Sequence, residues 1–252
     1  MSTLPKAYTR VAKKITGYWG TYLPFLELEP GVIGRVVEGI LVKEGHLNQY
    51  PGYDPKMHSV LEEAGRDPVS SWTSSRVSLS VFGVDAAAPA GGPTGGIRMQ
   101  FGEANEAAII CNANSYRSFQ NLRAVKDLMH QLLDQGRWDL DQCIVTEVLA
   151  TKTAWICFST GKDQTAELHA SAPVIPGADP LGVLNALAGN ANLIASSKNS
   201  EAAGYSTTLP SGGTPLFRAL QFRRTPWHPI HLAPEYLKGS DYAFEEPSFG
   251  EE

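Results

Sequence analysis

The sequence predicts an α+β protein in which helices surround a twisted, mostly antiparallel sheet. Three observations support this class. Glycine (24 residues) and proline (17 residues) are frequent, which favours many short strands joined by turns. Apolar and polar residues alternate in VSLSV (77–81) and IRMQF (97–101), as they do in half-buried strands. Two other stretches, at 4–18 and 115–135, repeat apolar residues every three or four positions, as amphipathic helices do.

The first predicted helix has an apolar face and a basic face. Thr3 is its expected N-cap, and Gly17 or Gly20 is its expected end. The apolar positions are Leu4, Tyr8, Val11, Ile15 and Tyr18. The basic positions are Lys6, Arg10, Lys13 and Lys14, and no acidic residue precedes Glu27. Such a helix either packs on a core with its lysines in solvent or binds an anionic surface.

Short strands and loops are expected between this helix and residue 114. GRVVEGILV (34–42) is apolar enough for one buried strand, and residues 43–56 are expected to form a loop. HSVLEEAGRDP (58–68) resembles a single helical turn that stops before the proline. The alternating strands 77–81 and 97–101 flank AAAPAGGPTGG (86–96), which is either an ordinary surface loop or a segment that reshapes in another state.

The second half of the chain opens with the strongest predicted helix, at 115–135, with Ser115 as its cap and Gly136 as its end. Its apolar stripe consists of Phe119, Leu122, Val125, Met129, Leu132 and Leu133. A β-rich stretch follows at 143–160, and its return strand is expected near 166–175. Residues 181–197 are ambiguous between helix and strand, and 207–223 predict a turn followed by a strand.

Composition and charge narrow the class of protein. The net charge is −5, and residues 235–252 hold six acidic residues against one basic residue, Lys238. The basic N-terminal helix and this acidic tail either attract each other or are merely solvated. Cys111, Cys143 and Cys157 form no CxxC pair and lie in apolar runs, which predicts buried thiols in a reducing compartment. No signal peptide or membrane-helix-length apolar run is present, so we expect a soluble cytoplasmic protein.

The sequence does not predict an enzyme. His228 and His231 are close together, but Pro229 disfavours a helix that presents both to one metal, and no carboxylate motif accompanies them. No GxSxG motif is present, and GGPTGG lacks the Lys-Ser/Thr end of a phosphate-binding loop. We therefore expect no catalytic residue, no metal and no cofactor. One small basic patch on an acidic protein also argues against nucleic acid as a partner.

Several segments, in order, resemble the pore-forming domain of gasdermins. YTRVAKKITGYWGTYLPFLEL (8–28) is similar to the basic first helix and the strand entry after it. VTEVLATK (145–152) is similar to a strand of the second hairpin, and TLPSGGTPLFRALQF (208–222) to a strand near the end of that domain. YDPKMHSVLEEAGRDP (53–68) looks like a further segment of the family. The resemblance covers most of residues 8–225 and rests on the shared order and spacing.

This resemblance implies a pore-forming function. Gasdermin pore domains are soluble until activated, bind acidic lipids of the inner leaflet, oligomerise, and refold two regions into four strands of a large transmembrane β-barrel. The corresponding regions here are about 77–110 and 144–174. The implied protein moves from cytoplasm to plasma membrane, permeabilises it from inside and causes regulated lytic cell death. Its partners would be acidic phospholipids and further copies of itself.

The length places the chain among short, microbial gasdermins. Residues 1–234 are expected to form the pore domain and 235–252 an acidic tail that acts as a restraint or is disordered, with no separate C-terminal repressor domain. Bacterial members usually carry a lipid-modified cysteine near the N-terminus, whereas the first cysteine here is Cys111. The fungal cell-death gasdermins of allorecognition, or heterokaryon incompatibility, therefore fit better, with activation by an antagonistic variant. The alternatives are a bacterial-type antiphage protein released by a protease that removes the tail, and a lipid-binding scaffold or transfer protein that forms no pore.

Specific residues follow from the resemblance and the charge pattern. The expected lipid-binding residues are Lys6, Arg10, Lys13, Lys14, Lys43 and Lys56. Tyr50 and Tyr53 are candidate membrane anchors, with ordinary loop packing as the alternative. The expected membrane-inserting strands carry Val77, Leu79, Val81, Ile97, Met99, Phe101, Val145, Val148, Trp155, Phe158 and Leu168. TAWICF (153–158) alternates poorly, so its register stays open.

Overall fold

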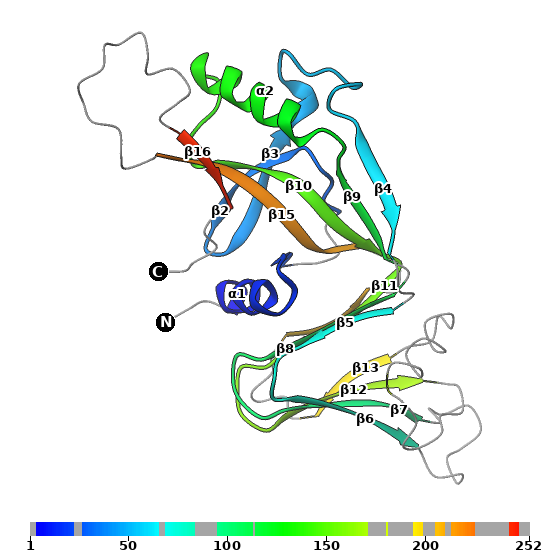
Figure 1. The fold of residues 1–252 in the computed structure, drawn as a ribbon. Coiled ribbons are helices and arrows are strands. Elements are labelled where there is room, and N and C mark those ends of the chain that lie inside the picture. Colours follow the sequence, from blue (N-terminus) through cyan, green and yellow to red (C-terminus); the bar gives the residue numbers. More distant parts are fainter. Residues whose placement is uncertain are drawn as a thin grey trace.

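Two α-helices and three antiparallel sheets build the described part of the chain in layers (Figure 1). The computed structural model describes residues 4–22, 27–65, 69–83, 95–112, 114–170, 180, 194–198, 205–209, 213–224 and 242–246. The layers follow the order α2, sheet A, α1, sheet B and sheet C, where the sheets are defined by the strands given below. The predicted α+β class with mostly antiparallel strands is confirmed.

The elements have the following bounds. The helices are α1 (Leu4–Thr16), α2 (Leu122–Asp134) and a single 3-10 turn, η1 (Leu47–Gln49). Sheet A contains β1 (Trp19–Gly20), β2 (Val32–Val37), β3 (Ile40–His46), β4 (Val60–Ala64), β9 (Ser115–Phe119), β10 (Gln142–Thr151), β15 (Gly213–Arg224) and β16 (Tyr242–Glu245). Sheet B contains β5 (Val69–Thr73), β8 (Ala107–Asn112), β11 (Thr153–Phe158) and β14 (Tyr205–Leu209). Sheet C contains β6 (Val77–Gly83), β7 (Gly95–Phe101), β12 (Gln164–Ala170) and β13 (Ile194–Lys198).

Strand β10 is the centre of sheet A. One side of β10 pairs with β15, and the other side pairs with β2 near its start and with β9 near its end. On one face of the sheet, α2 covers Ile33, Ile144 and Phe222 with Val125 and Met129. The opposite face holds a second core that includes Trp19, Val145 and Phe217. Sheet A therefore has both faces covered in its central strands.

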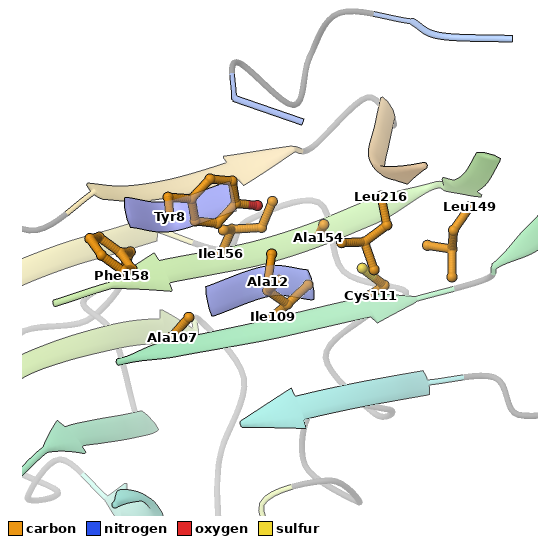
Figure 2. Packing of buried hydrophobic residues seen from close by; sticks show 10 residues of the cluster. All are labelled: Tyr8, Ala12, Ala107, Ile109, Cys111, Leu149, Ala154, Ile156, Phe158 and Leu216. Atoms are coloured by element: carbon orange, nitrogen blue, oxygen red, sulfur yellow. The ribbon is translucent and has the colours of Figure 1, made fainter. Parts of the chain in front are cut away.

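Helix α1 packs on sheet B through the face that the sequence predicted to be apolar. Figure 2 shows Tyr8 and Ala12 of α1 among residues of β8 and β11, including Ile109, Ile156 and Phe158. The rings of Tyr8 and Phe158 meet edge to face with centroids 6.1 Å apart. The other predicted apolar positions, Leu4, Val11, Ile15 and Tyr18, are partly buried against this cluster. The apolar face of α1 therefore packs on a core, as one of the two interpretations of this helix predicted.

The end of α1 agrees with the predicted glycine stop. Gly17 has a φ of +76° and donates its N–H to the carbonyl of Lys13 at 2.9 Å, a left-handed helix end that glycine adopts without strain. Thr3, the expected N-cap, lies outside the described residues.

Sheets B and C form a sandwich. Strands β7 and β8 follow each other across residues 102–106, and β11 and β12 follow each other across 159–163, so each pair passes from one sheet to the other. Between the sheets, Met99 and Leu168 of sheet C pack in one cluster with Ile110 and Trp155 of sheet B. The predicted hairpin of the two alternating strands is confirmed, because Leu79 of β6 pairs with Met99 of β7.

Three local predictions are wrong. Residues 34–42 form a hairpin of β2 and β3 rather than one strand, because Glu38 and Gly39 adopt left-handed φ values and reverse the chain. The predicted helical turn in 58–68 is strand β4, because its backbone pairs with β9 and a lone helical turn is costly to nucleate. Residues 115–119 are strand β9, and α2 begins later, where the side chain of Asn121 accepts the N–H of Ala124 at 3.1 Å.

The second β-rich stretch also differs from the prediction. It divides at Lys152 into β10 of sheet A and β11 of sheet B. The expected return strand, β12, pairs with β7 and β13 and not with either of them. The predicted strand after residue 212 is confirmed as β15, but residues 205–209 form strand β14 before it. Residues 84–94, 171–179 and 181–193 carry further predictions and lie outside the described part.

The turn between β2 and β3 packs closely against α1, and a substitution in the turn can test this contact. Gly39 has a φ of +80°, its carbonyl accepts the hydroxyl of Thr9, and a Cβ at this position would lie 2.6 Å from the Cα of Lys6. We expect Gly39→Ala to lower the free energy of unfolding by roughly 2–3 kcal/mol, measured by urea denaturation, because backbone strain and a backbone clash add. The control, Gly136→Ala, has a φ of +66° and open space around the new Cβ. Its cost should be only about 1 kcal/mol, and equal costs for both variants would contradict this contact.

Candidate functional site

The basic residues of α1 divide into an exposed and a half-buried pair. Arg10 and Lys14 are exposed, whereas Lys6 and Lys13 are half-buried. All four lie on the same helix, whose opposite side is fixed by Tyr8 and Ala12 on sheet B. Helix α1 therefore presents a cationic surface whose orientation is set by the core beneath it.

Lys13 is held by three groups. Its Nζ donates to the carbonyl of Gly17 at 2.9 Å, lies 5.0 Å from the centroid of the Trp19 ring and forms an ion pair with the carboxylate of Glu246. Glu246 directly follows β16, which pairs with the end of β15. Residues 242–246 of the acidic tail therefore contact both sheet A and the basic helix, so this part of the tail is folded against residues 1–234.

The other two predicted lipid-binding cations lie outside α1. Lys43 is exposed on β3, and Lys56 is exposed in the loop that follows η1. That loop lies beside α2, because a Cβ on Gly52 would be 2.9 Å from the Leu128 side chain. Since α1 and α2 lie on opposite sides of sheet A in Figure 1, Lys56 lies on the other side of the sheet from the α1 cations.

The two candidate anchor tyrosines are packed in this structure. Tyr50 and Tyr53 are both half-buried against the cluster under α2. The Tyr50 ring lies 6.1 Å from that of Trp138, and the Tyr53 ring stacks on His58 at 5.2 Å. Ordinary loop packing, the alternative interpretation of these residues, therefore describes their present contacts.

Sheet C brings together most of the residues predicted to enter a membrane. Its face toward sheet B is apolar and consists of Val77, Leu79, Val81, Ile97, Met99, Phe101, Ala166 and Leu168. Most intervening positions on the same strands are polar, namely Ser78, Ser80, Arg98, Gln100, Thr165 and Glu167; the exception is Phe82, on whose ring Arg98 lies. Among these, Arg98 binds Glu167 at 2.8 Å, and the Glu167 side chain is only 2% exposed. Sheet C thus has one apolar and one mainly polar face.

The remaining predicted inserting residues do not share this face. Val145 and Val148 belong to the core of sheet A with Phe217. On β11, Trp155 points toward sheet C, whereas Phe158 points toward α1. These positions therefore lie in different layers of this structure, because positions 155 and 158 lie three apart and fall on opposite sides of a strand, and their insertion into a membrane stays a prediction.

A polar contact between α1 and sheet A was not visible in the sequence. The hydroxyl of Tyr18 donates to the carboxylate of Glu147 at 2.5 Å. The guanidinium of Arg218 lies 4.4 Å from the centroid of the Tyr18 ring and 3.9 Å from the same carboxylate. Burial, with the hydrogen bond to Glu147 and the charge of that carboxylate, raises the pKa of Tyr18 well above its ordinary value. These groups fix the exit of α1 to the centre of sheet A.

Removing this hydroxyl should loosen α1. We expect Tyr18→Phe to lower the free energy of unfolding by about 1 kcal/mol, since a half-buried hydrogen bond to a carboxylate is lost. Because the raised pKa stabilises the folded state only while tyrosine is protonated, the difference from the unmodified protein should be constant below the ordinary tyrosine pKa of 10.0 and shrink above it. Urea denaturation at several pH values measures this. Tyr53→Phe, on the α2 side, is the control, and an equal pH dependence there would contradict the assignment.

Comparison with known proteins adds no relative: no protein-family model matches the chain, and no curated protein matches its sequence. Within the residues that the structure describes, no group of three or more histidine, cysteine, aspartate or glutamate side chains is arranged to hold a metal ion. No helix in the described ranges is both long and apolar enough to cross a membrane.

Proposed function

We propose that this chain is a membrane-permeabilising protein. In this proposal it docks on acidic phospholipids through α1, associates with further copies of itself and inserts strands as an oligomeric β-barrel, as the gasdermins that it resembles do. The observation that carries the proposal is sheet C, whose apolar face spans three paired strands and is covered by sheet B. An apolar face opposite a polar face is the pattern of strands that contact lipid on one side and water on the other.

The strands of sheet C reach the length needed to cross a membrane only when they join the strands of sheet B that follow or precede them. Strands β6 and β7 have seven residues each, which cover about 23 Å, and a tilted strand needs roughly 9–11 residues to cross the hydrocarbon. Strand β7 continues into β8 after a short bend, and β11 continues into β12 after another. Asn105 and Asp163 in these bends have left-handed φ values of 59° and 55°. Straightening the bends would give two continuous strands, 95–112 and 153–170, which overlap the regions that the resemblance implies.

Docking would rest on the cations of α1. A basic residue near an anionic surface contributes about 1 kcal/mol, so the four give on the order of 4 kcal/mol. This is weak for one chain and becomes strong when many chains act together. The ion pair of Lys13 with Glu246 competes with docking, which supports the acidic tail as the restraint. Removal of the tail by a protease or its displacement by an antagonistic variant would then be the trigger, and cell death at the plasma membrane the consequence.

Dye-loaded vesicles test the proposal. We expect the full chain, or the chain mixed with a variant partner or an activating protease, to release dye from vesicles that contain phosphatidylserine and not from phosphatidylcholine alone. Ring-shaped oligomers should be visible on the leaking vesicles by negative-stain electron microscopy. Binding to acidic vesicles without release under all these conditions would instead identify a lipid-binding scaffold or transfer protein.

A further inference from the structure

Two of the outer strands of sheet A, β4 and β16, have similar sequences. Strand β16 pairs with the end of β15, and β4 pairs with β9, so the two strands lie on opposite sides of β10; β1 and β3 are further edge strands on those two sides. Strand β4 pairs only with β9 among the described strands, and all five of its residues are exposed. Val60 and Leu61 are 46% and 41% exposed. An open edge with exposed apolar residues is a template for pairing with another strand.

Strand β16 covers the edge of β15 that a further strand would need. Residues 242–245 pair antiparallel with residues 221–224, and Glu246 then reaches Lys13 of α1. The sequence at this edge is AFEE (243–246), and the sequence of β4 begins VLEE (60–63). Both segments have two apolar residues followed by two glutamates. A VLEE strand in the register of β16 would place Glu63 at the position from which Glu246 binds Lys13.

The direction of the strands also fits. Each neighbouring pair from β15 through β10 and β9 to β4 is antiparallel, so β4 runs in the same direction as β16. A second copy that continues sheet A sideways, without turning over, would therefore present β4 antiparallel to β15. Because β4 and the edge of β15 are different surfaces, such a contact leaves one of each free at the ends of an assembly, which then grows until the rotation between copies closes a ring.

From these observations we infer that the edge of β15 is the self-association site of this protein and that its partner is β4 of a second copy. Strand β16 occupies this site in the single chain and must leave before the second copy binds. The inference rests on the proposed function for the need to oligomerise, but the interface itself is defined by sheet A. High local concentration on a membrane surface would favour the exchange of the short internal strand for an external one.

Cross-linking between differently tagged copies tests the interface. In the inferred register, residue 60 of one copy lies opposite residue 223 of the next, as residue 243 does within the chain. Directly opposed Cα atoms of antiparallel strands are about 4.5–5.5 Å apart, within disulfide reach. We expect full-length Val60→Cys and Arg223→Cys proteins, mixed on phosphatidylserine vesicles under mild oxidation, to form a disulfide-linked mixed dimer. Val42→Cys replaces Val60→Cys as the control, since Val42 is also 46% exposed but lies on β3, and its yield should be at least tenfold lower.

A disulfide that locks β16 onto β15 provides the second measurement. In the double variant Arg223→Cys and Ala243→Cys, an internal disulfide should hold β16 on β15 and abolish oligomers until a reductant is added. If the unmodified chain releases dye but the cysteine variants do not form the 60–223 cross-link, the interface is wrong and the pore proposal stands. If the cross-link forms but no dye is released, the interface is supported and the pore proposal is wrong. If neither the cross-link nor dye release is seen, both proposals are wrong. Oligomers of the oxidised lock variant equal to those of its reduced form would also overturn the interface.

Discussion

Replacing Arg10 and Lys14 with glutamate is expected to weaken binding to phosphatidylserine vesicles by on the order of a thousandfold. Both side chains are exposed on α1, so the fold should survive the change. Each substitution removes one attraction and adds one repulsion, and at about 1 kcal/mol per charge the two reversals amount to roughly 4 kcal/mol. Vesicle co-sedimentation measures binding, and dye release should fall with it. The binding of the unmodified chain should also weaken as salt is raised, because these charges are solvated.

A charge-matched control is available on the opposite side of sheet A. Arg123 and Arg137 are exposed near the two ends of α2. The double variant Arg123→Glu and Arg137→Glu has the same net charge as the α1 variant and should retain most of the binding. Equal losses in the two variants would mean that overall charge, and not the surface of α1, determines membrane binding.

Leu79→Lys is expected to abolish dye release while leaving vesicle binding largely intact. Leu79 lies near the middle of β6 on the face of sheet C that packs against sheet B, and it is only half-buried there. A lysine on the lipid face of a membrane strand costs about 2–4 kcal/mol near the bilayer midplane, and every copy in an oligomer bears this cost. Leakage assays should therefore show a loss of more than a hundredfold at equal bound protein.

The neighbouring position provides the control for this variant. Ser80 is exposed and alternates with Leu79, so Ser80→Lys adds the same charge to the polar face. It should bind and release dye like the unmodified chain. Circular dichroism and thermal unfolding must first establish that both variants are folded, because Leu79 contributes to the core between the sheets. If Ser80→Lys loses dye release and Leu79→Lys keeps it, the polar face and not the apolar face contacts lipid.

The sequence indicated those features that depend on neighbours along the chain. The period of two in 77–81 and 97–101 predicted strands β6 and β7, and the period of three to four predicted the buried side of α1. Their pairing was predictable because one connection joins them. The start of α2 was misplaced because SYRSF (115–119) is compatible with either period, and only pairing with β4 and β10 makes it a strand.

Features that depend on distant residues were not predictable in this way. The packing of sheet B on sheet C decides whether β12 pairs with β11 or with β7. The spacing of residues 166–175 does not indicate which partner is chosen. The basic face of α1 was visible from the sequence, but its contacts were not. Tyr18 and Glu147 are 129 positions apart, and Lys13 and Glu246 are 233 apart. Single-sequence periodicity carries no information about such pairs.

The three buried cysteines lie in different layers of the fold, so the reactivity of each thiol shows whether its layer has opened. Cys111 lies between α1 and sheet B, Cys157 between sheets B and C, and Cys143 in the core of sheet A. Burial raises the pKa of Cys111 far above its ordinary value and that of Cys143 to about 12, so neither thiol is reactive while its layer stays closed. Reaction of Cys157 alone would report that sheet C has left sheet B, whereas reaction of Cys111 would report that α1 has detached. A single thiol reagent, followed residue by residue, can thus order the steps of any refolding without an added probe.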